Sequence, residues 1–206
     1  GLFDHIIGLA TNAQHSPWGV AFNASQRMCI ETDSTWNERI PEAGIKGMMA
    51  ARSIALLSYR NYYTYNLTQP RDKKTAWPVP HPYGGEAAES YQRHPGEKLA
   101  QRFNAFSYYR LSQAMDAHDV GRGRNSIEEA LGRIRSKALM IGIANDLLFP
   151  PEEQEKIAAH IQDAEYHLIE SFYGHDGFLL EYEKIENLLK DFVQADNISY
   201  LKLVNQ

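Results

Sequence analysis

Asp146 and His175 are the two side chains whose type and position best suit acid–base chemistry. Each follows a predicted strand: residues 138–144 (ALMIGIA) have the composition of a buried strand, and residues 165–170 (EYHLIE) predict another strand. In open parallel sheets ligands bind beyond the carboxyl ends of the strands, so loops leaving neighbouring strands can meet there. In such a pair the aspartate fixes the imidazole tautomer and the histidine removes a proton from a nucleophile. This chain order matches the last two members of a Ser–Asp–His triad.

Other interpretations of the same residues stay open. A loop Asp–His pair is often a plain surface hydrogen bond, and Asp146 could instead cap the helix that follows it. Further histidines lie near predicted strands or helices, namely His5, His15, His160 and His167. The polar surroundings of His160 and the strand alternation around His167 indicate structural roles for both. Neither HxH nor HExxH spacing occurs, so we predict no metal site.

The elements that must position this pair alternate between strand and helix. Residues 6–10 form a continuous apolar run, which is typical of a fully buried parallel strand. After residue 125, a capping box at Ser126 and Glu129 predicts a short helix, and Pro150 and Pro151 predict the start of another. A last helix carries apolar residues at helical spacing: Leu180, Ile185, Leu188, Leu189 and Phe192. Alternating strands and helices predict a parallel α/β sheet.

Residues 15–119 have helical and irregular patterns instead. Asn23 with Gln26 suggests a capping box, and residues 47–59 predict a helix that is apolar on nearly every face. Residues 68–85 contain four prolines and predict a long loop. Residues 97–115 return to helical spacing, and the candidates for their buried face are Leu99, Phe103, Phe106 and Leu111.

The overall composition narrows the class of protein. The 206 residues carry a formal charge of −5 with interleaved signs and no basic tract, so a nucleic-acid partner is not expected. Cys29 is the single cysteine, which fits a reducing compartment without internal disulfides. Without a long apolar run or a signal peptide, we expect a cytoplasmic protein that does not span a membrane. A buried strand within the first ten residues suggests that the chain begins in the middle of a fold.

Several segments resemble the homoserine O-acetyltransferase family. Residues 145–151 (NDLLFPP) are similar to the family's segment around its catalytic aspartate, and residues 173–179 (YGHDGFL) to the segment around its catalytic histidine. Other similar segments occur in order along nearly the whole chain: AFN at 21–23 with QR at 26–27, AR at 51–52, ESY at 89–91, RFNAFSY at 102–108 and QAMD at 113–116. The resemblance implies a partial α/β-hydrolase fold with an inserted, mainly helical lid. We expect a core strand in residues 1–14, the lid in 15–125 and an α/β core in 126–206.

The resemblance also implies a reaction and roles for five residues. Acyl-CoA, such as acetyl-CoA, would acylate a serine, and the acyl group would pass to the homoserine hydroxyl in methionine biosynthesis. His175 would be the general base and Asp146 would orient it. Arg52 would bind the substrate carboxylate, with help from Tyr59, and Asp176 would receive the substrate amine. An arginine in an apolar helix needs a partner, and its fork fits a carboxylate, although an internal salt bridge would satisfy it equally.

The serine nucleophile of such an enzyme is missing from the sequence. No serine stands in a G-x-S-x-G elbow, so we expect this chain alone to be inactive and to need an N-terminal portion that completes the sheet. We also expect a homodimer through the lid helices, no bound cofactor, and acyl-CoA as cosubstrate. The alternatives are an esterase of the same fold and a truncated, non-catalytic interaction fragment. Acetyl or succinyl donors, and homoserine or serine acceptors, remain open.

Overall fold

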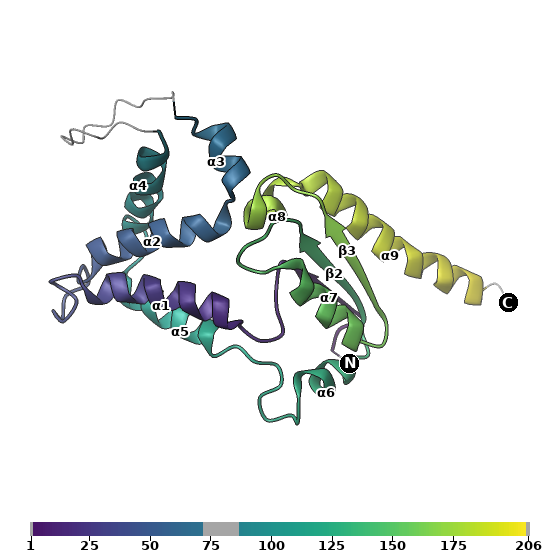
Figure 1. Cartoon of the computed structure of the whole chain (residues 1–206). Helices are drawn as coiled ribbons and strands as arrows, with labels where there is room; N and C mark the ends of the chain where they lie inside the picture. Colours follow the sequence, from purple (N-terminus) through teal and green to yellow (C-terminus); the bar gives the residue numbers. More distant parts are fainter. Residues whose placement is uncertain (1, 72–86, 205–206) are drawn as a thin grey trace.

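The computed structural model describes residues 2–71 and 87–204, so most of the loop predicted at 68–85 lies outside the described residues. Figure 1 shows helices α1 to α5 gathered on one side of the molecule and the sheet with its own helices on the other. The five helices, called the helical lid below, are α1 (Pro17–Glu31), α2 (Ile45–Tyr59), α3 (Tyr62–Thr68), α4 (Ala87–Ala100) and α5 (Ala105–Asp116).

A three-stranded parallel sheet forms the core, in the order β1-β2-β3. The strands are β1 (His5–Leu9), β2 (Lys137–Ile143) and β3 (Ala164–Ile169), and they confirm the three predicted strands. The expectation that the first strand is fully buried was wrong for this chain, because β1 is an outer strand of the described sheet and leaves Ile7 exposed. The helices that accompany them are α6 (Ile127–Gly132), α7 (Pro151–His160), α8 (Gly177–Leu180) and α9 (Tyr182–Val204). In the described part of the chain, no helix is long and apolar enough to cross a membrane.

The central strand β2 is buried on both faces, which explains its unbroken apolar sequence. Its side chains alternate between two apolar clusters, as the period of a strand requires. Leu139, Ile141 and Ile143 pack with Ile185 and Phe192 of α9. On the opposite face, β2 packs against α6 and α7 through the side chains of Ala138, Met140, Leu131, Ile157 and Ile161. Helices cover both faces, as parallel sheets require.

The helical lid packs so tightly that glycine is needed at a contact. A Cβ on Gly47 of α2 would lie 2.5 Å from the carbonyl oxygen of Cys29 and 2.6 Å from Cα of Ile30, both in α1. Ile30 and Met48 are fully buried at this contact and share one apolar cluster with Leu99. The close approach of α1 and α2 therefore depends on the absence of a side chain at residue 47.

Two predictions about helix boundaries were wrong. Asn23 lies inside α1, whose N-cap is Ser16 with its hydroxyl accepting from the Gly19 N–H at 3.1 Å. The predicted helix at 97–115 is two helices, because Asn104 caps the start of α5 by accepting from the Ser107 N–H at 2.8 Å. The break turns two of the four predicted core residues outward, since Phe106 and Leu111 are exposed.

A further boundary prediction was wrong, because the last predicted helix is two helices: Leu180 ends α8, and α9 begins at Tyr182. The other boundary signals agree with the structure. Ser126 caps α6 by accepting from the Glu129 N–H at 3.1 Å, and Pro151 opens α7. The limits expected for the three parts of the chain, at residues 14 and 125, fall in connections between elements and cut no helix or strand. Whether they bound separate folding units stays a prediction.

Candidate functional site

Asp146 and His175 meet beyond the carboxyl ends of β2 and β3. Asp146 follows Asn145, whose φ of 62° turns the chain sharply after β2, and His175 lies in the 3-10 turn Gly174–Asp176. The His175 Nδ1 atom is 2.8 Å from the Asp146 Oδ2 atom. The side chain of Asp146 is fully buried and that of His175 is 12% exposed, so this is no surface hydrogen bond.

Backbone donors fix the second carboxylate oxygen of Asp146. Its Oδ1 accepts from the N–H groups of Leu148 and Phe149 at 2.8 and 2.9 Å. These bonds close the turn before α7, whose own N-cap is Pro150, so Asp146 orders the loop rather than that helix. An ionised carboxylate only accepts hydrogen bonds, so the Nδ1 atom of His175 carries the hydrogen. Nε2 of His175 is then the nitrogen with a lone pair available for a proton.

Three aromatic rings surround the imidazole of His175. The centroids of Phe178, Phe149 and Tyr59 lie 5.1, 5.4 and 5.6 Å from its own. Phe149 and Phe178 each lie three residues after a member of the pair, and the sequence interpretation gave them no role. Only their nearness in sequence to Asp146 and His175 could have indicated one.

Arg52 and Tyr59 extend the site into the helical lid. The Arg52 guanidinium carbon lies 4.8 Å from the centroid of the Tyr59 ring, so Tyr59 stands between Arg52 and His175. Among the described residues, no carboxylate forms an ion pair with Arg52, so the alternative of an internal salt bridge finds no support there. Both residues line a cavity of about 310 Å³, together with Asn23, Gln26, Ser58, Leu99, Arg102, Phe103, Tyr108, Leu111, Ser112, Met115 and Leu148.

Tyr108 of α5 is a cavity residue to which the sequence assigned no role, although it ends the RFNAFSY segment that resembles the family. Its hydroxyl donates a hydrogen bond to the Gln26 Oε1 atom of α1. Burial raises the pKa of Tyr108, and neighbouring Tyr59 raises it further, whereas Arg52 lowers it. Tyr108 is therefore a neutral hydrogen-bonding group at the wall of the cavity, rather than a base.

Asp176 is not the free surface carboxylate that its position after His175 could suggest. Its Oδ2 atom lies 2.9 Å from Nε of Arg60, and the side chains are 16% and 20% exposed. Burial raises the pKa of Asp176, while the nearby charges of Arg60, His175 and Arg52 lower it. The structure thus places this carboxylate among cations and beside the imidazole.

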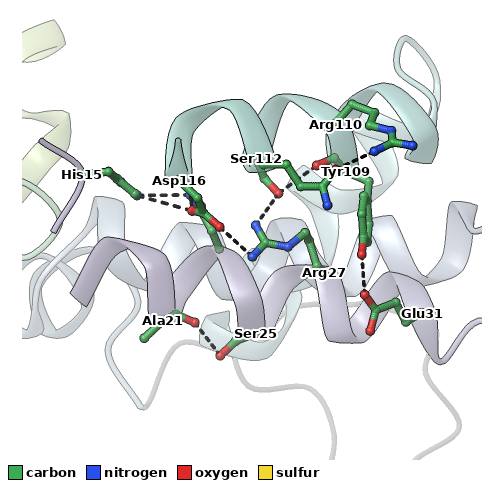
Figure 2. Close-up of polar contacts among 11 residues, drawn as sticks. His15, Ala21, Ser25, Arg27, Glu31, Tyr109, Arg110, Ser112 and Asp116 are labelled. Atoms are coloured by element: carbon green, nitrogen blue, oxygen red, sulfur yellow. Dashed lines mark hydrogen bonds and ion pairs between the residues drawn. The ribbon is translucent and has the colours of Figure 1, made fainter. Parts of the chain in front are cut away.

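The helical lid also contacts the loop that carries Asp146. Trp18 of α1 donates from Nε1 to the Leu147 carbonyl at 2.6 Å, and the His15 ring lies 6.1 Å from that of Phe149. Figure 2 shows His15 beside Asp116 of α5, at the end of a set of polar contacts that joins α1 to α5. His15 thus supports the site from outside the Asp–His pair.

Three of the other histidines considered in the sequence lie elsewhere in the fold. The His5 ring packs on Phe192, His160 Nδ1 lies 2.8 Å from the Lys156 carbonyl, and His167 is 3.6 Å from a Glu165 oxygen. Within residues 2–71 and 87–204, no group of three His, Cys, Asp or Glu side chains is placed to hold a metal ion.

Solved structures establish the class of fold. A homoserine O-acetyltransferase from Bacillus anthracis superimposes with a TM-score of 0.81 at 24% identity, covering 92% of this chain and 52% of that one. Esterase E22 superimposes with a TM-score of 0.80 at 16% identity, covering 93% and 55%. The chain therefore has an α/β-hydrolase fold, of which it forms a part, with the helical lid that its sequence predicted.

Sequence relatives name a family within that class. The chain is 45% identical to the homoserine O-acetyltransferase of Cyclobacterium marinum and 41% identical to that of Thermus thermophilus, over 94% and 91% of its length. It spans about half the length of these relatives, 53% and 46%. No protein-family model matches the chain. The chain is thus homologous to about half of a homoserine O-acetyltransferase, and the predicted resemblance is confirmed.

Proposed function

We propose that this chain supplies the base and the acceptor site of an acyltransferase that acylates homoserine. The observation that carries the proposal is the 2.8 Å contact between His175 and the buried Asp146, at one end of a stack that continues through Tyr59 to Arg52. Sequence relatives named homoserine O-acetyltransferase support the choice of reaction.

In the first half-reaction, a serine from outside this sequence attacks the thioester carbonyl of acyl-CoA. Nε2 of His175 takes the proton from the serine hydroxyl and delivers it to the departing CoA sulfur. The buried Asp146 carboxylate stabilises the imidazolium that forms in between. The products of this half are an acyl-serine and free CoA thiol.

In the second half-reaction, the homoserine hydroxyl attacks the acyl-serine carbonyl. Nε2 of His175 removes the hydroxyl proton and returns it to the serine oxygen as that oxygen leaves. Arg52 binds the substrate carboxylate and Asp176 its ammonium, while Tyr59 packs between Arg52 and the base. The substrate hydroxyl is thereby oriented towards the acyl-serine.

The direct test measures CoA release and ester formation by the assembled enzyme that contains this chain. With acetyl-CoA, CoA thiol should appear at a rate that depends on homoserine, and mass spectrometry should detect O-acetylhomoserine. Parallel reactions in which succinyl-CoA replaces acetyl-CoA, or serine replaces homoserine, identify the acyl donor and the acceptor that the enzyme uses. The absence of any acylated amino acid would contradict the proposal.

Esterase activity is the second candidate, because the fold is shared with esterase E22. A hydrolase would release CoA, or p-nitrophenol from its acetate ester, at a rate that homoserine does not change. Arg52 and Asp176 favour the transferase, because a simple ester substrate needs no binding site for a zwitterion.

A further inference from the structure

The corner between α2 and α3 touches the His175 loop at consecutive residues. Tyr59 is the last residue of α2 and its ring packs on His175, while the next residue, Arg60, pairs with Asp176. Arg60 leaves the helix in an extended conformation, with φ −113° and ψ 171°, so it no longer follows the direction of Tyr59. The adjacent residues Tyr59 and Arg60 therefore contact two adjacent residues of the His175 loop.

Backbone contacts hold this corner in place. Gly174 has a φ of 65°, and a Cβ there would lie 3.4 Å from the Arg60 carbonyl carbon and 3.5 Å from the Tyr59 carbonyl oxygen. On the far side of the corner, the Thr64 hydroxyl donates to the Phe172 carbonyl at 2.6 Å. The distance between Arg60 and Asp176 is thus set by the packing of both loops, and not only by their mutual attraction.

Arg60 leaves half of the Asp176 carboxylate available. Its Nε atom lies 2.9 Å from Oδ2, close enough for an ion pair although the N–H does not have hydrogen-bond geometry. No other side chain or N–H group of the described residues forms a hydrogen bond or ion pair with Asp176. The Asp176 side chain is 16% exposed, and Oδ1 is the carboxylate oxygen that Arg60 does not contact, so it is the one left for a small cation.

We propose that Arg60 is a positioning residue, which keeps Asp176 ionised and aimed beside His175 so that it can receive the substrate ammonium. The proposal rests on the proposed function, because it assumes an amino-acid acceptor. Arg60 itself touches neither the reacting atoms nor the substrate. It acts by offsetting the burial of a carboxylate that would otherwise favour the neutral form.

The charges around Asp176 are consistent with this role. Burial is the largest influence on the pKa of Asp176 and raises it, and Arg60 is the largest influence that lowers it. The other charged groups that face it are His175, Arg52 and Asp146, from the same turn, α2 and the loop after β2. Removing Arg60 should therefore raise the pKa further, and a protonated Asp176 cannot attract an ammonium group.

The test compares Arg60→Gln and Arg60→Lys in the assembled enzyme that contains this chain. Arg60→Gln should raise the KM for homoserine roughly tenfold or more and move the acid limb of its pH profile to higher pH. CoA release in the absence of homoserine should not change. Arg60→Lys keeps the charge and should restore much of the loss, and thermal unfolding checks that both variants are folded.

Two comparisons separate positioning from a general structural effect. In an Asp176→Asn background, Arg60→Gln should not raise the KM for homoserine any further, because the carboxylate that Arg60 positions is no longer present. Arg93→Gln is the matched control, since Arg93 pairs with Glu89 at an exposed site of α4 and should leave KM and the pH profile unchanged. An equal effect of Arg60→Gln in both backgrounds would overturn the proposal.

A second readout does not depend on turnover. In a ¹³C NMR titration, the Asp176 carboxyl of the Arg60→Gln variant should take up its proton at a higher pH than in the unaltered protein. An unchanged titration would overturn the role of Arg60. If the titration shifts but the unaltered enzyme never acylates homoserine, the proposed function fails while the pairing of Arg60 with Asp176 stands.

Discussion

At the scale of single residues, the site depends on a carboxylate that has no contact with water. The Oδ1 atom of Asp146 orders its own loop by accepting from backbone N–H groups, and the Oδ2 atom holds His175. Leaving a buried partner unsatisfied is more damaging than losing a surface contact. This division makes Asp146 both a structural and a catalytic candidate.

We expect His175→Ala and Asp146→Asn each to lower kcat of the assembled enzyme by about 10³-fold or more without unfolding it. An amide at residue 146 can still accept at Oδ1, but it no longer stabilises an imidazolium. Steady-state rates and circular dichroism provide the measurement. Near-normal turnover in either variant would remove that residue from the triad.

Arg52→Lys tests the carboxylate-binding role. The variant keeps the positive charge but loses the planar fork and its stacking on Tyr59, so homoserine use should fall about tenfold or more. CoA release without homoserine should stay nearly intact. If that first half-reaction falls by the same factor, Arg52 is a structural residue.

At the scale of elements, α1 and α5 are joined by charged and polar side chains as well as by apolar packing (Figure 2). Arg27 binds Asp116 at 2.6 Å and Ser112 at 2.9 Å, and Asn23 donates to Asp116 at 2.8 Å. The side chains of Arg27 and Asp116 are only 14% and 18% exposed. Since Asn23 and Ser112 also line the cavity, this contact fixes part of its wall.

Arg27→Met should therefore lower the free energy of unfolding by about 1–3 kcal/mol, because it leaves the shielded Asp116 without its cation. Chemical denaturation measures the change. Arg133→Gln is the control, since Arg133 and Glu129 form an exposed pair on α6 and its loss should cost less than about 0.5 kcal/mol. If both variants lost the same free energy of unfolding, the burial of the Arg27–Asp116 pair between α1 and α5 would not add to its contribution.

The contact between α1 and α2 gives a second prediction. Gly47→Ala would push a methyl group into the backbone of Cys29 and Ile30, so we expect a loss of about 1–3 kcal/mol or more. Gly132→Ala is the matched change in α6, where the nearest heavy atom would be 3.8 Å away. It should be neutral or stabilising by up to about 1 kcal/mol. A harmless Gly47→Ala would show that the two helices can move apart.

At the scale of the whole molecule, α1 and α5 expose apolar side chains that this chain leaves uncovered. Met28 is 62% and Leu111 56% exposed, with Phe106 and Met115 also on the surface. Large apolar side chains exposed together on two packed helices are typical of a contact between proteins, although Leu111 and Met115 also line the cavity. We propose that these helices form the interface of a homodimer, which the family resemblance also implies.

Sedimentation of the assembled enzyme at micromolar concentration should reveal this dimer. Met28→Glu should shift the equilibrium towards monomer, because it places a charge in an apolar contact. Val193→Glu on α9 is the control, since Val193 is also exposed but lies outside the helical lid, and it should leave the dimer intact. A monomeric unaltered enzyme would exclude an interface through the lid.

Local sequence patterns by themselves determined the strands, most of the helices and the Asp146–His175 pair. The three predicted strands are confirmed as parallel strands. Of the described strands, only β2 is buried on both faces, which explains its continuous apolar sequence, whereas β1 and β3 are the outer strands and leave Ile7 and Leu168 exposed. Asp146 and His175 could be paired because strand ends in a parallel sheet face the same edge. The strands follow from neighbours in sequence, whereas the choice of this pair over a surface hydrogen bond also used the resemblance of both segments to the family.

Only the tertiary structure decided which distant side chains meet. The pairs Arg60–Asp176 and Tyr59–His175 join a helix end to a loop more than a hundred residues away, and no spacing along the chain encodes such contacts. Asn23 had the pattern of a helix cap, but α1 begins at Ser16 instead. Asn23 therefore lies inside the helix, where its side chain donates a hydrogen bond to Asp116 of α5. Packing between elements, rather than local preference, settled these positions.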